Sequence, residues 1–293
     1  MRAMILLLGG SGYVGAAFAR ALSERGLEVL APSRQVLDAA DRDQVAAIVA
    51  EVKPRFVINA IGYTGRPNID STEREKMRCL TENTVVPGIL AEVLSERNIP
   101  WGHVSSGCIF QGTRPDGTPF TEEDAPNFPF GHPDASWYSR TKAMAEIMLR
   151  DHPNCLVWRL RIPFDEFDHP RNYLTKIMRY ERLLEVTNTI SQLQEFASVS
   201  VETLLRGLPG GTYNVTNPGA IRTSEVAEAL RRAGLTQREF VFFHDEAEFL
   251  SDSAHVRRAS CQLSSAKLAS LGLPLRPIHE ALDWTLRNWK WAR

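Results

Sequence analysis

Tyr138 and Lys142, four positions apart, form a pattern that can move a proton. In a helix this spacing places both side chains on one face. A tyrosine phenol, with an ordinary pKa near ~10, is a poor acid or base at neutral pH, and a neighbouring ammonium lowers that pKa by favouring the phenolate. The same spacing is common on solvated helix faces. Its interpretation therefore depends on what other segments place beside it.

A glycine-rich turn lies near the start of the chain. Residues 8–15 stand between an apolar run that predicts a strand and a pattern that predicts a helix. Glycines in such a turn let the backbone approach a pyrophosphate and let the helix pack closely on the strand. The helix N-terminus then offers unpaired N–H groups to the phosphates. We therefore expect a dinucleotide site built from Gly9, Ser11, Gly12, Tyr13, Val14 and Gly15.

The segment after the second predicted strand indicates which nicotinamide cofactor binds. An NAD site usually carries an acidic residue here, which holds the ribose 2′-hydroxyl. This chain has Pro32, Ser33 and Arg34 instead. An arginine pairs well with a 2′-phosphate, so NADPH is the expected cofactor and NADH the alternative. A solvated surface arginine would look the same in the sequence.

Short apolar runs alternate with helical patterns through the first two thirds of the chain, which predicts an α/β fold. The runs do not alternate with polar residues, as is typical of parallel strands buried on both faces. We predict a Rossmann-type doubly wound parallel sheet with a smaller C-terminal substrate lobe. The expected strands are 4–8, 28–31, 56–61, 101–105 and 156–160, with helices around 14–22 and 86–94.

The regular alternation loosens after Pro163, which predicts a second lobe. Residues 1–163 would form the dinucleotide-binding domain, and segment 191–216 would return to it. Residues 164–190 and 217–293 would form the substrate-binding lobe above the carboxyl ends of the strands. Segment 111–136 contains five prolines and three glycines, so we expect a loop that leads into the helix of Tyr138.

Composition argues against several classes of protein. The formal charge is −1, and no segment concentrates basic residues as a nucleic-acid-binding face would. The four cysteines form no CxxC pair and no metal-ligand spacing with the seven histidines, so we expect neither a disulfide framework nor a metal. No apolar run approaches the ~20 residues that span a bilayer. The expected location is the cytoplasm.

Together these motifs resemble the extended short-chain dehydrogenase/reductase family. The resemblance is carried by the GxxGxxG spacing of the turn, by Ser106 after the strand at 101–105, and by Tyr138 with Lys142 about thirty residues later. It implies that Ser106 binds the substrate carbonyl and that Lys142 also holds the nicotinamide ribose. Asn83 matches a fourth catalytic residue of the family, although a helix-capping asparagine would look alike. Further cofactor contacts are implied for Asp38, Ala60, Ile61, Gly62 and Pro163.

Several windows resemble one branch of that family, the UDP-4-keto-6-deoxy-glucose 3,5-epimerase/4-reductases of UDP-L-rhamnose synthesis. The windows are 63–70, 107–110, 123–128, 138–144, 170–176 and 213–219. The chain is more distantly similar to dTDP-4-dehydrorhamnose reductase and GDP-L-fucose synthase. The resemblance implies that Cys108 and Lys176 form the acid/base pair of an epimerase. It also implies substrate contacts by Arg66, Asn68, Asn172 and Arg258.

These observations predict an NADPH-dependent nucleotide-sugar 4-keto reductase that also acts as a 3,5-epimerase. Its product would be a UDP- or dTDP-linked 6-deoxy-L-hexose such as L-rhamnose. Two alternatives stay open: a reductase only, acting on another 4-keto sugar nucleotide, and a non-catalytic NADP(H)-binding regulatory subunit. An intact Ser106, Tyr138 and Lys142 argues against the second. The expected partner is a nucleotide-sugar substrate, with a homodimer as an open alternative.

Overall fold

A six-stranded parallel sheet forms the centre of the protein, whose computed structural model describes residues 4–292. The strand order is β10-β5-β4-β3-β1-β2, and every neighbouring pair runs parallel. This confirms the predicted α/β class and the parallel sheet. The strands are β1 (Ile5–Leu8), β2 (Val29–Leu30), β3 (Phe56–Asn59), β4 (Trp101–Ser106), β5 (Cys155–Leu160) and β10 (Gly211–Asn214).

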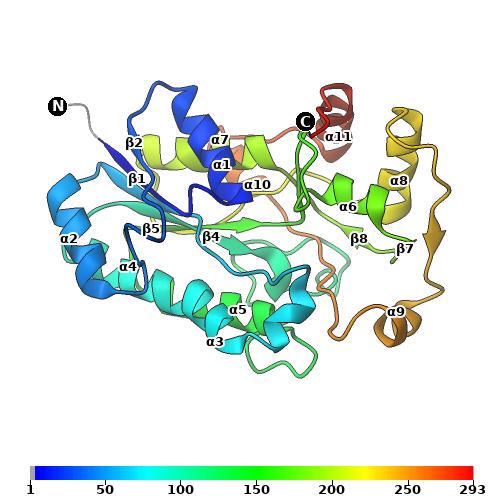
Figure 1. Ribbon diagram of the computed structural model, residues 1–293, viewed down its shortest axis with the longest axis horizontal. Helices are drawn as coiled ribbons and strands as arrows, with labels where there is room; N and C mark the ends of the chain where they lie inside the picture. Colours follow the sequence, from blue (N-terminus) through cyan, green and yellow to red (C-terminus); the bar gives the residue numbers. More distant parts are fainter. Residues whose placement is uncertain (1–3, 293) are drawn as a thin grey trace.

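Alternating side chains of β1 explain why helices cover both faces of the sheet. Ile5 and Leu7 join the apolar cluster beneath α1 (Tyr13–Ser23) and α7 (Leu193–Leu205). Leu6 and Leu8 join the cluster beneath α2 (Arg42–Val52) and α4 (Val86–Ser95). Successive strand residues point to opposite faces, so a run of four leucine or isoleucine residues serves both. Figure 1 shows α1 and α7 on one side of the sheet and α2, α4 and α5 (Trp137–Leu149) on the other.

The connection from β3 to β4 is almost entirely helical. It contains η1 (Ile69–Glu73), α3 (Lys76–Leu80) and a π-helical turn, η2 (Thr81–Val85), which continues directly into α4. Of these elements, the sequence predicted only the helix α4, around residues 86–94. π-Helical turns are rare and occur frequently at functional sites. After β4 a single turn, η3 (Gly107–Ile109), begins the long loop that leads to α5.

The strand order reverses between β1 and β3, and ligands of such sheets bind at the carboxyl ends of the strands at this point. Two glycines allow the loops to meet there. Gly9, with φ +77°, lies so near the next loop that a Cβ would be 2.9 Å from the Ile61 nitrogen. A Cβ on Gly15 would be 2.0 Å from the Gly9 oxygen. Any larger residue would push the first turn of α1 away from the sheet.

A separate apolar cluster lies beyond the sheet and joins α6 (Tyr173–Arg179), α8 (Thr223–Arg232) and α11 (Ile278–Arg287). Short strands connect these helices: β6 (Pro163–Phe164), β7 (Arg182–Leu183), β8 (Thr187–Asn188), β9 (Ser191–Gln192), β11 (Ile221–Arg222) and β12 (Val241–Phe242). The helix α9 (Glu246–Asp252) completes this part. By contrast, Leu268 in α10 (Ala266–Ser270) packs into the cluster beneath α1 and α7. The predicted domain boundaries stay a prediction.

Candidate active site

The carboxyl end of β4 carries two of the expected catalytic residues. Ser106 is the last residue of the strand and Cys108 lies in η3, and both are buried. The Ser106 hydroxyl oxygen accepts the N–H of Cys108 at 3.3 Å and so caps η3. An oxygen that accepts this bond still has its own proton to donate. Ser106 is therefore arranged to donate a hydrogen bond to a substrate oxygen.

The helix α5 brings Tyr138 and Lys142 to the same place. It begins at Trp137 because the Ser136 hydroxyl caps it, accepting the Ser139 N–H at 3.1 Å. Tyr138 lies in its first turn. The Lys142 ammonium donates to the carbonyl of Val104, in β4, at 2.9 Å. The predicted helix and the predicted approach of both residues to the β4 terminus are thus present in the structure.

Burial controls the titration of both side chains. It raises the pKa of the Tyr138 phenol well above its ordinary range, an effect that the nearby thiol of Cys108 reinforces and a contact with Ser106 opposes. It lowers the pKa of Lys142 to about 8. The net shift of the tyrosine pKa is opposite to the lowering expected from the sequence, because loss of water around the phenol outweighs the nearby charges. A protonated phenol is the form that donates a proton.

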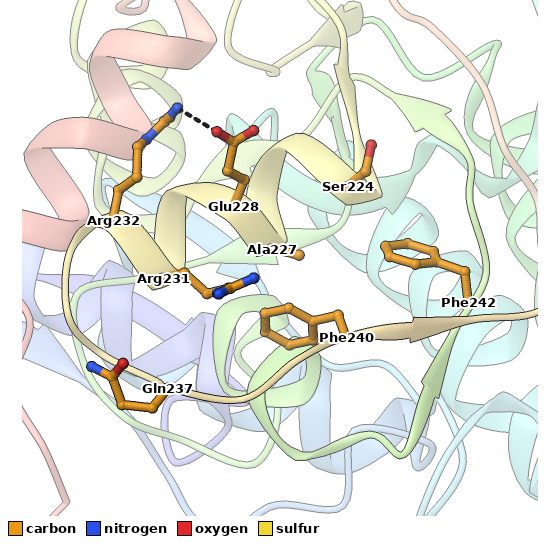
Figure 2. Close-up of a pocket in the computed structure, with 8 residues that line it drawn as sticks. All are labelled: Ser224, Ala227, Glu228, Arg231, Arg232, Gln237, Phe240 and Phe242. Atoms are coloured by element: carbon orange, nitrogen blue, oxygen red, sulfur yellow. Dashed lines mark hydrogen bonds and ion pairs between the residues drawn. The ribbon is translucent and has the colours of Figure 1, made fainter.

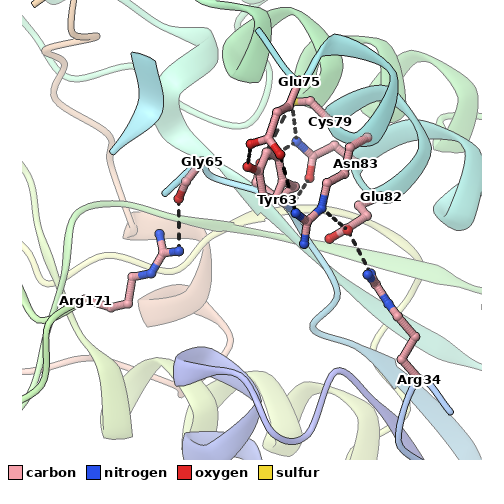
Figure 3. Close-up of polar contacts among 9 residues, drawn as sticks. Arg34, Tyr63, Gly65, Glu75, Cys79, Glu82, Asn83 and Arg171 are labelled. Carbon is pink, nitrogen blue, oxygen red and sulfur yellow. Dashed lines mark hydrogen bonds and ion pairs between the residues drawn. The ribbon is translucent and has the colours of Figure 1, made fainter. Parts of the chain in front are cut away.

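Asn83 connects the loop after β3 to the catalytic helix. Its Oδ1 accepts the Tyr63 N–H at 2.8 Å, and its Nδ2 donates to the Tyr63 carbonyl at 3.0 Å (Figure 3). The same Nδ2 donates to the hydroxyl of Thr141, next to Lys142, at 3.1 Å. Asn83 lies inside η2 and is fully buried. The alternative of a helix cap is therefore wrong, and Asn83 positions the site.

The cofactor side of the site consists of the glycine turn and α1. Gly12 is the N-cap of α1 and has no side chain to accept the first N–H groups of the helix. Those groups, with the close approach that Gly9 and Gly15 require, form a cradle that suits a pyrophosphate. Ser11 is exposed, and Tyr13 and Val14 lie half-buried in the first turn. Ala60, Ile61 and Gly62 form the loop facing them, and a Cβ on Gly62 would be 3.4 Å from the Lys142 ammonium nitrogen.

Arg34 has an acidic partner that the sequence did not reveal. Its guanidinium lies 2.7 Å from Oε1 of Glu82 (Figure 3). Arg78 donates to the same oxygen at 3.1 Å. Glu82 is buried in η2, whereas the Arg34 side chain is 65% exposed. Arg34 is therefore anchored at one nitrogen and open to solvent elsewhere. Asp38 is exposed, and its Oδ1 accepts the Ala40 N–H at 3.0 Å.

Two arginines of the second lobe hold the loop that carries Arg66. Arg258 binds both oxygens of Asp70, at 2.6 and 2.8 Å. Arg171 donates to the carbonyl of Gly65 at 3.0 Å (Figure 3). Neither partner was predicted from the sequence, because the residues lie more than 100 positions apart. Arg258, expected to bind substrate, is thus balanced by a carboxylate, while Arg66 is exposed.

Asn68 and Asn172 both act as helix caps. Asn68 accepts the Asp70 N–H at 2.9 Å at the start of η1. Asn172 is fully buried; it accepts the Leu174 N–H at 3.0 Å and donates to the carbonyl of Asp165 at 2.7 Å. With its amide engaged in this way, Asn172 fixes α6 instead of exposing polar atoms to a sugar.

Lys176 stands in α6, whereas Tyr138 and Lys142 stand in α5. The Lys176 ammonium forms no hydrogen bond or ion pair with residues 4–292 of the protein. Burial lowers the pKa of Lys176, and the positive charges of Arg171 and Arg258 lower it further. A lysine in this setting gives up its proton more readily than one in water.

An open hollow of about 530 Å³ lies elsewhere, between α8 and the segment of β12 (Figure 2). Arg231, Phe240 and Phe242 line it, and none of the expected site residues does. We locate the active site by the strand termini instead, because Ser106, Tyr138 and Lys142 converge there. Within residues 4–292, no three histidine, cysteine or acidic side chains are placed to hold a metal, and no helix is long and apolar enough to cross a membrane.

A parallel sheet with a phosphate-binding turn at its switch point, and with Ser106, Tyr138 and Lys142 at the end of β4, defines a Rossmann-type reductase. Residues 1–290 match the family described as RmlD substrate binding domain. The chain belongs to this family. The family resemblance predicted from the sequence is confirmed.

The relatives are enzymes of nucleotide-sugar metabolism. A bifunctional dTDP-4-dehydrorhamnose 3,5-epimerase/dTDP-4-dehydrorhamnose reductase from Arabidopsis thaliana is 35% identical over 77% of this chain and 74% of its own. Trifunctional Arabidopsis relatives are matched over 33–40% of their length. The L780 UDP-rhamnose synthase of Acanthamoeba polyphaga mimivirus superposes with a TM-score of 0.89 at 27% identity, over 98% of this chain and 100% of that one. A Bacillus anthracis dTDP-4-dehydrorhamnose reductase in complex with NADP shares the fold, with a TM-score of 0.80 at 18% identity over 98% of each chain.

Replacing Arg34 tests its role in cofactor choice. We expect Arg34→Ala to weaken NADPH binding by roughly one to two decades, since a charge-assisted contact contributes about 1.5–3 kcal/mol, and to leave NADH binding unchanged. Fluorescence titration of both cofactors measures this. Arg42→Ala is a matched control, because Arg42 also forms an exposed pair with a glutamate. An equal loss for the two cofactors would show that Arg34 does not read the 2′-phosphate.

Lys142 gives a pH-dependent contribution to stability. Its pKa of about 8 in the folded protein lies below the ordinary 10.5, so between these values the unfolded chain binds more protons and the wild type gains stability as pH rises. Relative to wild type, the free energy of unfolding of Lys142→Met should therefore fall by up to about 3 kcal/mol from below pH 8 to pH 10.5. Denaturant unfolding at several pH values measures it, with exposed Lys76→Met as control. A pH-independent difference would contradict the burial argument.

Proposed function

We propose that the chain is an NADPH-dependent 4-keto reductase of a nucleotide-linked 6-deoxyhexose that also epimerises its substrate at C3 and C5. The product would be a UDP- or dTDP-linked 6-deoxy-L-hexose such as L-rhamnose. The observation that carries this proposal is the convergence of Ser106, Cys108 and Tyr138 at the end of β4. The printed activities of the Arabidopsis and mimivirus relatives support the substrate, and the NADP complex supports the cofactor.

In the reduction, each residue has a separate task. The hydride is what a bound reduced nicotinamide supplies. Ser106 donates its hydroxyl proton in a hydrogen bond to the C4 carbonyl oxygen. Tyr138 is protonated because burial raises its pKa, and it gives its proton to the oxygen as negative charge develops there. The Lys142 ammonium, one turn further along the same helix, would favour the phenolate that remains.

Epimerisation uses the acidity that the 4-keto group gives to C3 and C5. The Cys108 thiolate removes a proton, and the C–H electron pair becomes part of an enolate. The Lys176 ammonium then protonates the same carbon from the opposite face, leaving a thiol and an amine, and solvent returns the proton from sulfur to nitrogen. The lowered pKa of Lys176 favours this donation. Cys108 stands in η3, after β4, and Lys176 in α6, and the sugar ring would bind between these two side chains.

Tyr138→Phe tests the reduction step. We expect turnover to fall roughly 10²–10⁴-fold, the usual loss when a general acid is removed, while NADPH affinity is kept. NADPH consumption with a 4-keto sugar nucleotide measures turnover, and a non-catalytic regulatory subunit would consume none. Tyr180→Phe, at an exposed tyrosine, is the matched control. A Tyr138→Phe protein that reduces at the normal rate would refute the assignment.

Deuterium exchange tests the epimerisation step separately. In D₂O the wild type is expected to exchange the hydrogens at C3 and C5 of an unepimerised 4-keto substrate for deuterium, even without NADPH. Cys108→Ser and Lys176→Ala should lose exchange at one or both carbons yet still reduce a pre-epimerised substrate, because neither delivers hydride. Cys155→Ser, at a buried cysteine of β5, is the control. If the wild type reduces the substrate well but exchanges no deuterium, the protein is a reductase only. If both variants exchange normally, Cys108 and Lys176 are not the acid/base pair.

A further inference from the structure

Arg161 is a buried arginine that neither of the steps above uses. It follows the last residue of β5 and is 6% exposed. Its Nη2 donates to Oδ1 of Asn188 at 2.6 Å and to the carbonyl of Ala259. Both oxygen acceptors of the guanidinium among residues 4–292 are therefore neutral, and the thiol of Cys261 also lies beside it. Arg159, two positions earlier, differs in this respect: it is equally buried but pairs with Glu146 at 2.7 Å.

The guanidinium of Arg161 also keeps one donor unused. Its Nε is buried and has no hydrogen-bond partner among the described residues. A buried donor without an acceptor costs about 1–3 kcal/mol, and more when it is charged. A buried cation without an anion is costly as well. Both costs are accounted for if negative charge forms beside Arg161 during the reaction.

Arg161 lies directly beside the turn that carries Cys108. Leu160 pairs with Ser106 across the sheet, so the next residues of the two strands, Arg161 and Gly107, are neighbours. A Cβ on Gly107 would be 3.1 Å from Cδ of Arg161, so glycine lets the arginine approach the turn. Ile162, with φ 37°, then holds a backbone conformation that β-branched residues rarely adopt. Such strain persists where the surrounding structure enforces it, often at functional sites.

The charges that face the Cys108 thiol come from α5 and from the end of β5. Burial raises its pKa, and the positive charges of Arg161 and Lys142 lower it, as do hydrogen bonds with two serines. The serines are Ser106 and Ser139, and the other titratable groups near the thiol are Tyr138, Cys79 and Cys261, whose thiol donates to the carbonyl of Gly107 at 3.2 Å. Lys142 has a lowered pKa of about 8, so its charge is lost in mildly alkaline solution. A guanidinium keeps its charge throughout.

We propose that Arg161 supplies the permanent positive charge that stabilises the Cys108 thiolate, the base of the epimerisation step. This rests on the epimerase activity proposed above. Arg161 is a positioning residue in this role, because it acts through Cys108. The reduction does not depend on the thiolate, so the contribution of Arg161 should be visible mainly in the epimerisation step.

Titration of the thiol tests the proposal without any substrate. The ultraviolet absorbance of the thiolate is followed against pH, as the difference between each protein and its Cys108→Ser counterpart. In Arg161→Gln the midpoint should rise by about one pH unit, equivalent to about ten-fold less thiolate at neutral pH. Deuterium exchange should slow by a similar factor. Arg161→Lys, which keeps a charge, should restore most of both.

A second variant keeps the test valid if Arg161→Gln does not fold. Asn188→Asp places a carboxylate at the position that now binds Nη2 at 2.6 Å, so it neutralises the guanidinium without removing it and should raise the thiol midpoint in the same direction. An unchanged midpoint in the folded variants would overturn the proposal for Arg161. If the thiol midpoint rises in the variants but the wild type exchanges no deuterium, the proposed epimerase activity is refuted, while the effect of Arg161 on the thiol is supported.

Discussion

The side-chain amide of Asn83 is the contact on which the geometry of the site depends. It binds both backbone groups of Tyr63 and the hydroxyl of Thr141, so it joins the loop after β3 to the helix of Tyr138 and Lys142. The π-helical turn η2 makes this possible, since its extra residue turns Asn83 toward the catalytic helix and its neighbour Glu82 toward Arg34 (Figure 3). One irregular turn thus supports both the reacting end and the cofactor-selecting end of the site.

Burial then decides which charges the site retains. It raises the pKa of Tyr138 and of Cys108 and lowers the pKa of Lys142 and of Lys176. All four shifts favour the neutral form, as removal of water should. A neutral phenol suits proton donation during reduction. A neutral thiol does not suit proton removal, so the two activities place opposite demands on one buried site. A guanidinium such as that of Arg161, which stays charged, can serve the second demand without disturbing the first.

The sequence predicted those parts of the molecule that local patterns encode. Apolar runs located five of the six strands of the sheet, but β10 contains Gly211, Thr212 and Asn214 and therefore gave no such signal. Ser106, Tyr138 and Lys142 were found because each has a fixed position relative to a strand or a helix. The partners Glu82 and Asp70 were not, because each meets its arginine across 48 or more positions of the chain. Such pairings depend on the tertiary fold, and no spacing rule in one sequence reveals them.

The central claim is that this chain transfers a hydride to C4 of a nucleotide-linked 4-keto-6-deoxyhexose. The most direct measurement uses NADPH deuterated at the nicotinamide C4 position that donates hydride, with UDP- and dTDP-linked 4-keto-6-deoxyglucose as substrates in ordinary water. NMR and mass spectrometry of the product locate the label. The account predicts one deuterium, bound to C4 of a 6-deoxyhexose. A product without deuterium at C4, or no product from either nucleotide, would contradict it.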